Sequence, residues 1–131
     1  MHPKVKICGM KNAETIKTAI NHKVDFLGFV FYPDSPRTLT QKQATILTKN
    51  IPNHIGKVAV LVNETDQFIE YIKNDFDYFQ LHGNEDVKRI KEIRQKFNKK
   101  IIKVIKVTNE DSAKTYSQYG DEVDMFLFDS P

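Results

Sequence analysis

The chain has 131 residues, of which 40% are hydrophobic and 28% are charged, and its formal net charge is +3. This composition is typical of one soluble domain that can bury a core, and it argues against wholesale disorder. No apolar run approaches the roughly 20 residues of a membrane span, and the Lys-containing start lacks a signal-peptide core. A single cysteine excludes an internal disulfide framework and a zinc cluster built from cysteines. We therefore expect a single domain over residues 1–131, in the cytoplasm and away from membranes.

Short apolar segments recur along the chain, and each is nearly continuous rather than cleanly alternating. Such β-branched and aromatic segments are typical of strands that are buried on both faces of a parallel sheet. In chain order the predicted strands are Val5–Cys8, Phe26–Tyr32, Val58–Val62, Tyr78–Leu81, Ile101–Val107 and Met125–Phe128.

Amphipathic helical patterns lie between these strands. Helices are predicted after Asn12, after Thr40, after Asn63, over Val87–Phe97 and after Asn109. Thr40 with Gln43 forms a capping-box pattern, whereas the helix after Asn109 has the weakest apolar stripe.

Strand and helix alternate throughout, which indicates right-handed βαβ units and an α/β fold. Two architectures fit this pattern: an open doubly wound sheet, or part of an eight-stranded parallel β/α barrel of the TIM type. A complete barrel normally needs about 200 residues or more, so the periodicity by itself does not choose between them.

Cys8 is the first candidate for chemistry. On its strand Val5 and Ile7 share one side, so Cys8 lies on the other and would point into a barrel at the carboxyl end of the strand. As a thiolate it would act as a base or nucleophile, and the structural alternative is a small buried hydrophobic residue. Gly9, directly after it, permits the tight turn or close ligand approach that a site needs.

Three further candidates follow later strands. Asp129 ends the last apolar run, where partial burial would favour a protonated carboxyl group that acts as a general acid; the alternative is an ordinary turn residue. Arg37 closes a loop stiffened by two prolines and can present its guanidinium group to a carboxylate or phosphate; the alternative is a solvated surface arginine. His82 ends the fourth strand, either as a polar wall of the site or as a histidine that is satisfied within the fold.

The lysine-containing segment Lys96–Lys106 does not predict nucleic-acid binding. Lys99 and Lys100 lie at a helix-to-strand turn, Lys103 and Lys106 lie within an apolar strand, and no aromatic stacking platform accompanies them. A solvated turn is the favoured interpretation. The sequence also lacks a Walker motif, a Gly-x-Gly-x-x-Gly motif and a histidine pair with metal-ligand spacing.

Taken together, these segments resemble the phosphoribosylanthranilate isomerase family. The resemblance extends over the whole chain and rests on segments 6–10 (KICGM), 28–37 (GFVFYPDSPR), 60–63 (VLVN), 80–83 (QLHG) and 126–129 (FLFD). It implies a β/α barrel that catalyses an Amadori rearrangement of N-(5-phosphoribosyl)anthranilate in tryptophan biosynthesis. It also implies that Cys8 is the general base and Asp129 the general acid, with Arg37, His82 and Gly9 contacting the substrate. No metal or organic cofactor is implied, because the imine intermediate is its own electron sink.

The chain ends two residues after Asp129, whereas the family continues through two more strands and a Gly-rich stretch. We therefore expect an incomplete barrel of about six of the eight β/α units. The unpaired edges of such a sheet predict self-association. An inactive, self-associating fragment and a barrel enzyme for another phosphosugar are the alternatives to an isomerase.

Overall fold

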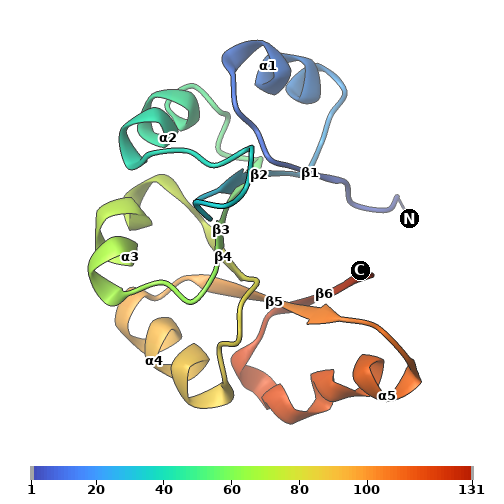
Figure 1. Cartoon of the computed structure of the whole chain (residues 1–131). Helices are drawn as coiled ribbons and strands as arrows, with labels where there is room; N and C mark the ends of the chain where they lie inside the picture. The colour runs from blue at the N-terminus through green and yellow to red at the C-terminus, as the bar shows by residue number, and fades with distance from the viewer. Residues whose placement is uncertain (1, 131) are drawn as a thin grey trace.

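The computed structural model describes residues 2–130, and its six strands form one parallel sheet in chain order (Figure 1). The strands are β1 (Lys6–Cys8), β2 (Phe26–Val30), β3 (Gly56–Leu61), β4 (Tyr78–Leu81), β5 (Lys100–Lys106) and β6 (Met125–Asp129). Each strand is hydrogen-bonded in parallel register with the next one along the chain. All six predicted strands are present, with ends that differ by no more than two residues.

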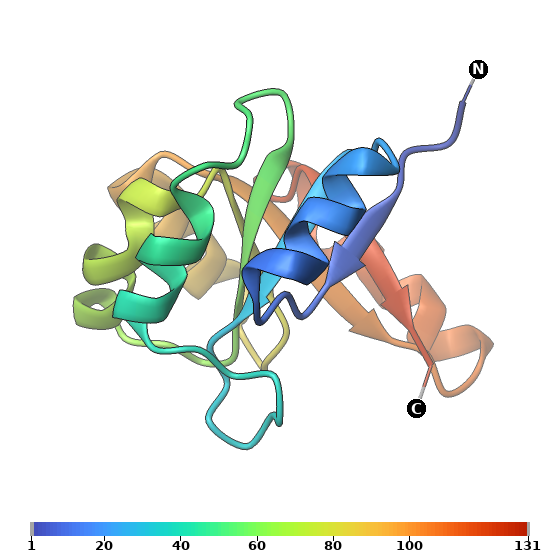
Figure 2. The same cartoon turned by 90° about the horizontal axis from the view of Figure 1, so that it is seen from above.

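The helices lie around the outside of the curved sheet, and the two termini lie on its open side (Figure 1). The α-helices are α1 (Ala13–Asn21), α2 (Gln41–Thr48), α3 (Asp66–Ile72), α4 (Val87–Phe97) and α5 (Glu110–Ala113), and the 3₁₀ helices are η1 (Lys73–Asp75) and η2 (Lys114–Glu122). A doubly wound sheet would have helices on both faces. Here the strands follow one another in chain order and the helices cover one face only, so the fold is a half-barrel and not a doubly wound sheet (Figure 2).

Side-chain hydrogen bonds fix the starts of the helices. Asn12 caps α1 by accepting from Thr15 N, and Thr40 and Gln43 form the predicted capping box of α2. The helix predicted after Asn63 is capped by Thr65 instead. Each such cap satisfies backbone N–H groups that would otherwise lack partners at the helix start.

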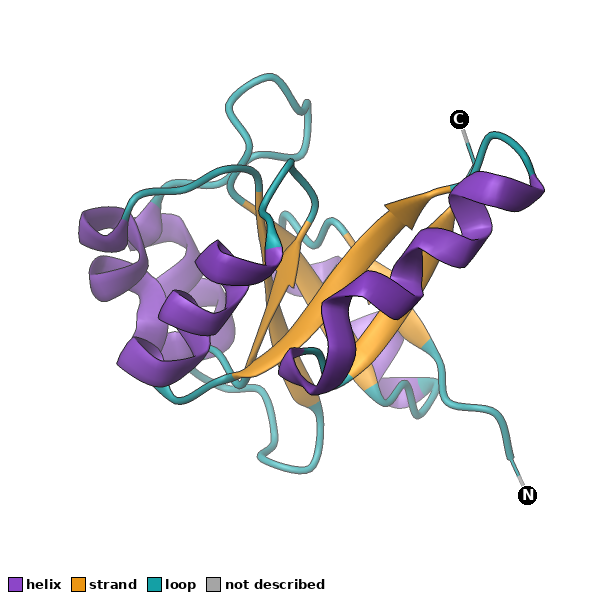
Figure 3. Ribbon diagram, turned by 90° about the horizontal axis from the view of Figure 1, so that it is seen from below, coloured by secondary structure: helices purple, strands orange, loops and turns teal. Residues whose placement is uncertain are grey.

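The fifth helical segment differs most from the sequence expectation. The α-helix α5 has only four residues, and the chain then continues as the 3₁₀ helix η2, in which Gly120 has a positive φ of 57°. Figure 3 shows this helical segment outside the sheet. No residue of either element is buried. Tyr116 and Tyr119 of η2 pack against Phe126 of β6, with ring centroids 5.5 and 6.2 Å apart, but neither tyrosine is buried. With so little burial, little selects a regular α-helix over looser turns.

The main core lies between the outer face of the sheet and the helices. Strand alternation places Phe29, Phe79 and Leu81 on this face, and all are almost fully buried. Phe29 packs against Phe76 with ring centroids 5.6 Å apart. The inner face is left free to carry the residues of a site.

The same pair of reciprocal hydrogen bonds recurs at the amino ends of the strands, and the sequence analysis did not predict it. Asp25 accepts a hydrogen bond from Val5 N at 2.7 Å and donates its own N–H to Val5 O at 2.9 Å. Asp77 with Lys57 and Asp124 with Ile101 repeat this two-way contact. These aspartates directly precede β2, β4 and β6, so each joins its strand to the one before.

Burial raises the pKa of Asp124, but hydrogen bonds from Arg94 and Ile101 N–H outweigh it and hold the pKa below its usual value.

No helix within residues 2–130 is long and apolar enough to cross a membrane.

Candidate functional site

A cleft of about 370 Å³ opens where strands β1–β5 end. It is lined by Cys8, Val30, Tyr32, Ser35, Arg37, Val60, Val62, Gln80, His82 and Lys106. Three of the predicted site residues, Cys8, Arg37 and His82, therefore share one cavity. Gly9 and Asp129 are not among the residues that line it.

Two glycines allow Cys8 and Arg37 to lie close together. A Cβ on Gly28 would come within 2.8 Å of Cys8 Sγ, so the thiol lies against the backbone of β2. Gly9 has a φ of +87°, and a Cβ there would lie 2.5 Å from Cδ and Nη1 of Arg37. The Arg37 guanidinium donates to Cys8 O at 2.9 Å. Gly9 thus allows the close approach of Arg37, and its predicted contact with the substrate stays a prediction.

The loop before Arg37 is held by its own polar contacts. Tyr32 donates its hydroxyl proton to Asp34 at 2.9 Å, and this hydrogen bond raises the pKa of Tyr32. Ser35 accepts from Arg37 N, and Lys11 donates to Pro36 O at 2.8 Å. A loop restrained in this way loses less entropy when its arginine binds an anion.

His82 lies between the cleft and Asp129. Its backbone N–H donates to Leu61 O at 2.8 Å, and its Nε2 lies 3.7 Å from Asp129 Oδ2. Burial lowers the pKa of His82, and the nearby Asp129 only partly offsets this. Burial thus favours the neutral form of the imidazole, and 3.7 Å is too long for a hydrogen bond. The Asp129 side chain is 46% exposed and lies beside His82 rather than in the lining of the cleft.

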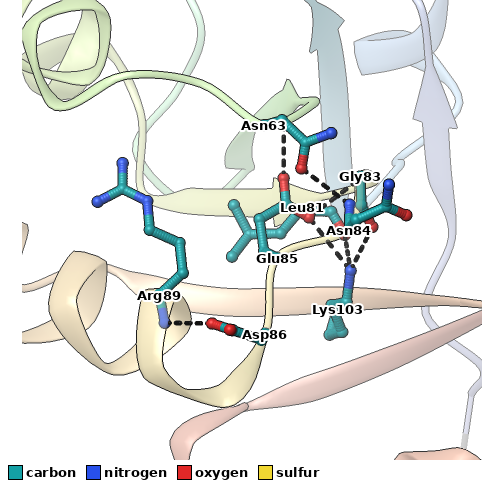
Figure 4. A network of polar contacts seen from close by, with 8 residues as sticks. All are labelled: Asn63, Leu81, Gly83, Asn84, Glu85, Asp86, Arg89 and Lys103. Carbon is teal, nitrogen blue, oxygen red and sulfur yellow. Dashed lines mark hydrogen bonds and ion pairs between the residues drawn. The ribbon is translucent and has the colours of Figure 1, made fainter.

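A buried ion pair holds the loop that follows His82 (Figure 4). Lys103 Nζ lies 3.2 Å from Glu85 Oε1 and also donates to Gly83 O at 2.8 Å, and both charged side chains are at most 3% exposed. The Glu85 carboxylate accepts from Gly83 N at 2.9 Å and from Asn63 N at 2.8 Å. A Cβ on Gly83 would lie 2.6 Å from Asn63 Oδ1, so the loops after β3 and β4 touch. One carboxylate thus fixes both loops at the edge of the cleft.

The sequence analysis placed Lys103 within an apolar strand but did not predict this pair. Lys103 is not solvated but 2% exposed, because it lies on the helix-facing side of β5 and its amine reaches back to the loop after β4. The sequence reading also gave no site role to Lys106 and Gln80, which line the cleft. Both residues lie toward the carboxyl ends of their strands, on the side opposite to the core residues. The alternation of side chains along a strand could therefore have predicted that they face the cleft.

Within residues 2–130 no group of three or more metal-ligating side chains is assembled. The polar groups of the cleft are a thiol, a carboxamide, an imidazole, hydroxyls and two cations. Such a set can bind an anionic organic molecule and transfer protons on it.

The family model described as N-(5'phosphoribosyl)anthranilate (PRA) isomerase matches residues 5–131. An N-(5'-phosphoribosyl)anthranilate isomerase from Staphylococcus epidermidis is 42% identical over 130 residues, which are 97% of this chain and 62% of that protein. The crystal structure of phosphoribosyl anthranilate isomerase from Thermotoga maritima superposes with a TM-score of 0.87 at 29% identity, over 99% of this chain and 62% of that one.

A second crystal structure of such an isomerase, in complex with reduced 1-(o-carboxyphenylamino)-1-deoxyribulose 5-phosphate, gives the same TM-score and identity, over 99% of this chain and 66% of that one. The chain spans 62–63% of the length of the curated relatives from Staphylococcus epidermidis and Zymomonas mobilis. The matched part includes every strand of the sheet.

Proposed function

The chain belongs to the N-(5'-phosphoribosyl)anthranilate isomerase family, and on that premise we propose that it carries the acid–base site for the Amadori rearrangement of N-(5'-phosphoribosyl)anthranilate, a step of tryptophan biosynthesis. The observation that supports this most is the shared cleft of Cys8, Arg37 and His82, with Asp129 beside His82. Cys8 and His82, the first and last of these three residues in the chain, are 74 positions apart. They meet at one edge of the sheet because parallel strands end together there.

Asp129 acts first in this proposal. It donates a proton to the oxygen of the furanose ring, the bond between that oxygen and the anomeric carbon breaks, and the nitrogen lone pair forms a protonated imine. His82 lines the cleft and lies 3.7 Å from Asp129 Oδ2, so the Asp129 carboxyl group is close to a molecule bound beside His82.

Cys8 acts second, as a thiolate. It removes the proton from the neighbouring sugar carbon, and the electron pair of that C–H bond moves toward the imine nitrogen to give an enolamine. A proton then adds to the former anomeric carbon, and the enol becomes the ketone of the 1-deoxyribulose product. The imine accepts the electrons, so protons are all that the protein has to move.

Arg37 binds the anthranilate carboxylate. Its guanidinium group is at the cleft with one N–H on Cys8 O, which leaves other donors of the planar fork for a carboxylate. Because Arg37 touches the same strand end as Cys8, carboxylate binding sets the distance between the sugar carbon and the thiol.

Turnover of phosphoribosylanthranilate is the direct test. We expect Cys8→Ser and Asp129→Asn each to lower kcat by roughly 10²-fold or more, the scale of a general acid or base. Arg37→Ala should mainly raise KM, because the carboxylate lies away from the bonds that change. The exposed Asp111→Asn serves as the matched control and should leave both constants unchanged. Near-normal turnover by Cys8→Ser would contradict the proposed base.

We also propose that the 131-residue polypeptide self-associates through the edges of its sheet. Within residues 2–130, β1 and β6 each have one hydrogen-bonded neighbour, and Ile7 and Phe128 on them are 40% and 53% exposed. Unpaired backbone groups beside apolar side chains are a template for pairing with another strand. Small-angle scattering over a concentration series measures this, and a concentration-independent monomer would refute it.

A further inference from the structure

Gln80 is a buried polar residue whose side-chain oxygen forms no hydrogen bond within the described part of the chain. It is 3% exposed, and its Oε1 has no hydrogen-bond partner among the described residues. On the neighbouring strands the residues in register with it are Val60 and Ile102, which have no polar side-chain atoms. A carboxamide enclosed by apolar neighbours costs stability unless something supplies its hydrogen bonds.

The position of Gln80 indicates what supplies them. Gln80 lies on β4, and His82 directly follows the strand two residues later, on the same side of the chain. Both side chains line the cleft with Cys8. The core residues Phe79 and Leu81, on either side of Gln80, face the helices instead. The Gln80 side chain therefore lines the cleft and is turned away from the core between the sheet and the helices.

We propose that Gln80 is a substrate-binding residue whose carboxamide hydrogen-bonds a hydroxyl group of a sugar at the floor of the cleft. This inference rests on the proposed function and extends it. A carboxamide offers a donor and an acceptor without charge, which matches a hydroxyl group, itself a donor and an acceptor. The cations Arg37 and Lys106 also line the cleft, so its anion-binding groups are distinct from Gln80.

The first arm of the test measures thermal stability. Methionine has nearly the length and volume of glutamine but needs no hydrogen bonds, so Gln80→Met removes the unpaired amide without opening a cavity. We expect its melting temperature to rise by about 3 °C. The control is Thr48→Val, which removes a buried hydroxyl that donates to Ala44 O at 2.9 Å and should not raise the melting temperature.

The second arm measures binding by titration calorimetry, with reduced 1-(o-carboxyphenylamino)-1-deoxyribulose 5-phosphate as the probe. We expect Gln80→Met to weaken its binding by about 10-fold, the loss of one hydrogen bond, and Thr48→Val to leave it unchanged. Anthranilate, which has the carboxylate but no sugar, should bind Gln80→Met and the unaltered chain equally.

Each contrary outcome refutes either the assignment of Gln80 or the proposed function. A Gln80→Met chain that is less stable than the unaltered one, or that fails to fold, would mean that the amide has partners within the fold and would refute the assignment. Equal binding of the sugar probe by both chains would refute the role of Gln80 alone. No binding of that probe by the unaltered chain would refute the proposed function and this inference with it.

Discussion

Replacing Lys103 by methionine tests the buried pair that ties the loops after β3 and β4 together. The substitution keeps most of the side-chain volume but leaves the Glu85 carboxylate, which is 2% exposed, with only the N–H groups of Asn63 and Gly83 as partners. Breaking a buried ion pair from one side typically costs 3–5 kcal/mol. The two remaining N–H donors offset part of this, so we expect the free energy of unfolding to fall by about 3 kcal/mol at pH 7.

Urea unfolding followed by circular dichroism measures the loss. The matched control is Lys57→Met, which also removes a strand lysine that pairs with a carboxylate. Lys57 Nζ lies 3.5 Å from Asp77 Oδ2, at the opposite end of the sheet, and the Asp77 side chain is 49% exposed. The Lys57 side chain is 14% exposed, but the solvated Asp77 carboxylate weakens the pair, so we expect it to contribute no more than about 1 kcal/mol. In Lys103→Met/Glu85→Gln both charges are gone, and the loss should be smaller than in Lys103→Met. Equal losses in Lys103→Met and Lys57→Met would refute this account of the buried pair.

Three other features give predictions of their own. Asp124→Ala removes the acceptor of a backbone N–H and the partner of Arg94, and should lower the free energy of unfolding by about 2 kcal/mol in urea melts. Gly9→Ala places a Cβ at a positive φ and against Arg37, so we expect the free energy of unfolding in urea melts to fall by about 1–2 kcal/mol. A free energy of unfolding within error of the unaltered chain would contradict the strained geometry. The pKa of His82, measured by NMR titration, should lie below 6.5 because of burial. The unfolded chain then binds the extra proton first, so His82 contributes stability that is present above about pH 6.5 and is lost as the pH falls toward its folded pKa. An unshifted titration would show that the ring is not desolvated.

The sequence alone determined the local elements and their order. The strand at Tyr78–Leu81 has the predicted bounds, and the capping box of Thr40 and Gln43 forms as predicted, because both depend on residues that are close together in the chain. Strand parity also placed Cys8 on the inner face, since successive side chains must alternate. The fifth helix was the exception, because Tyr116 of its weak stripe packs against Phe126 of β6 without becoming buried.

Only the tertiary structure decided which residues meet across strands. Glu85 and Lys103 are 18 positions apart, and periodicity predicts which side of an element is apolar but not which loop a lysine amine reaches. For the same reason the sequence did not distinguish the unpaired amide of Gln80 from one with partners, since that depends on Val60 and Ile102 in the adjacent strands. Hydrogen bonds and burial depend on distances between segments, and those distances exist only once the strands are aligned in register.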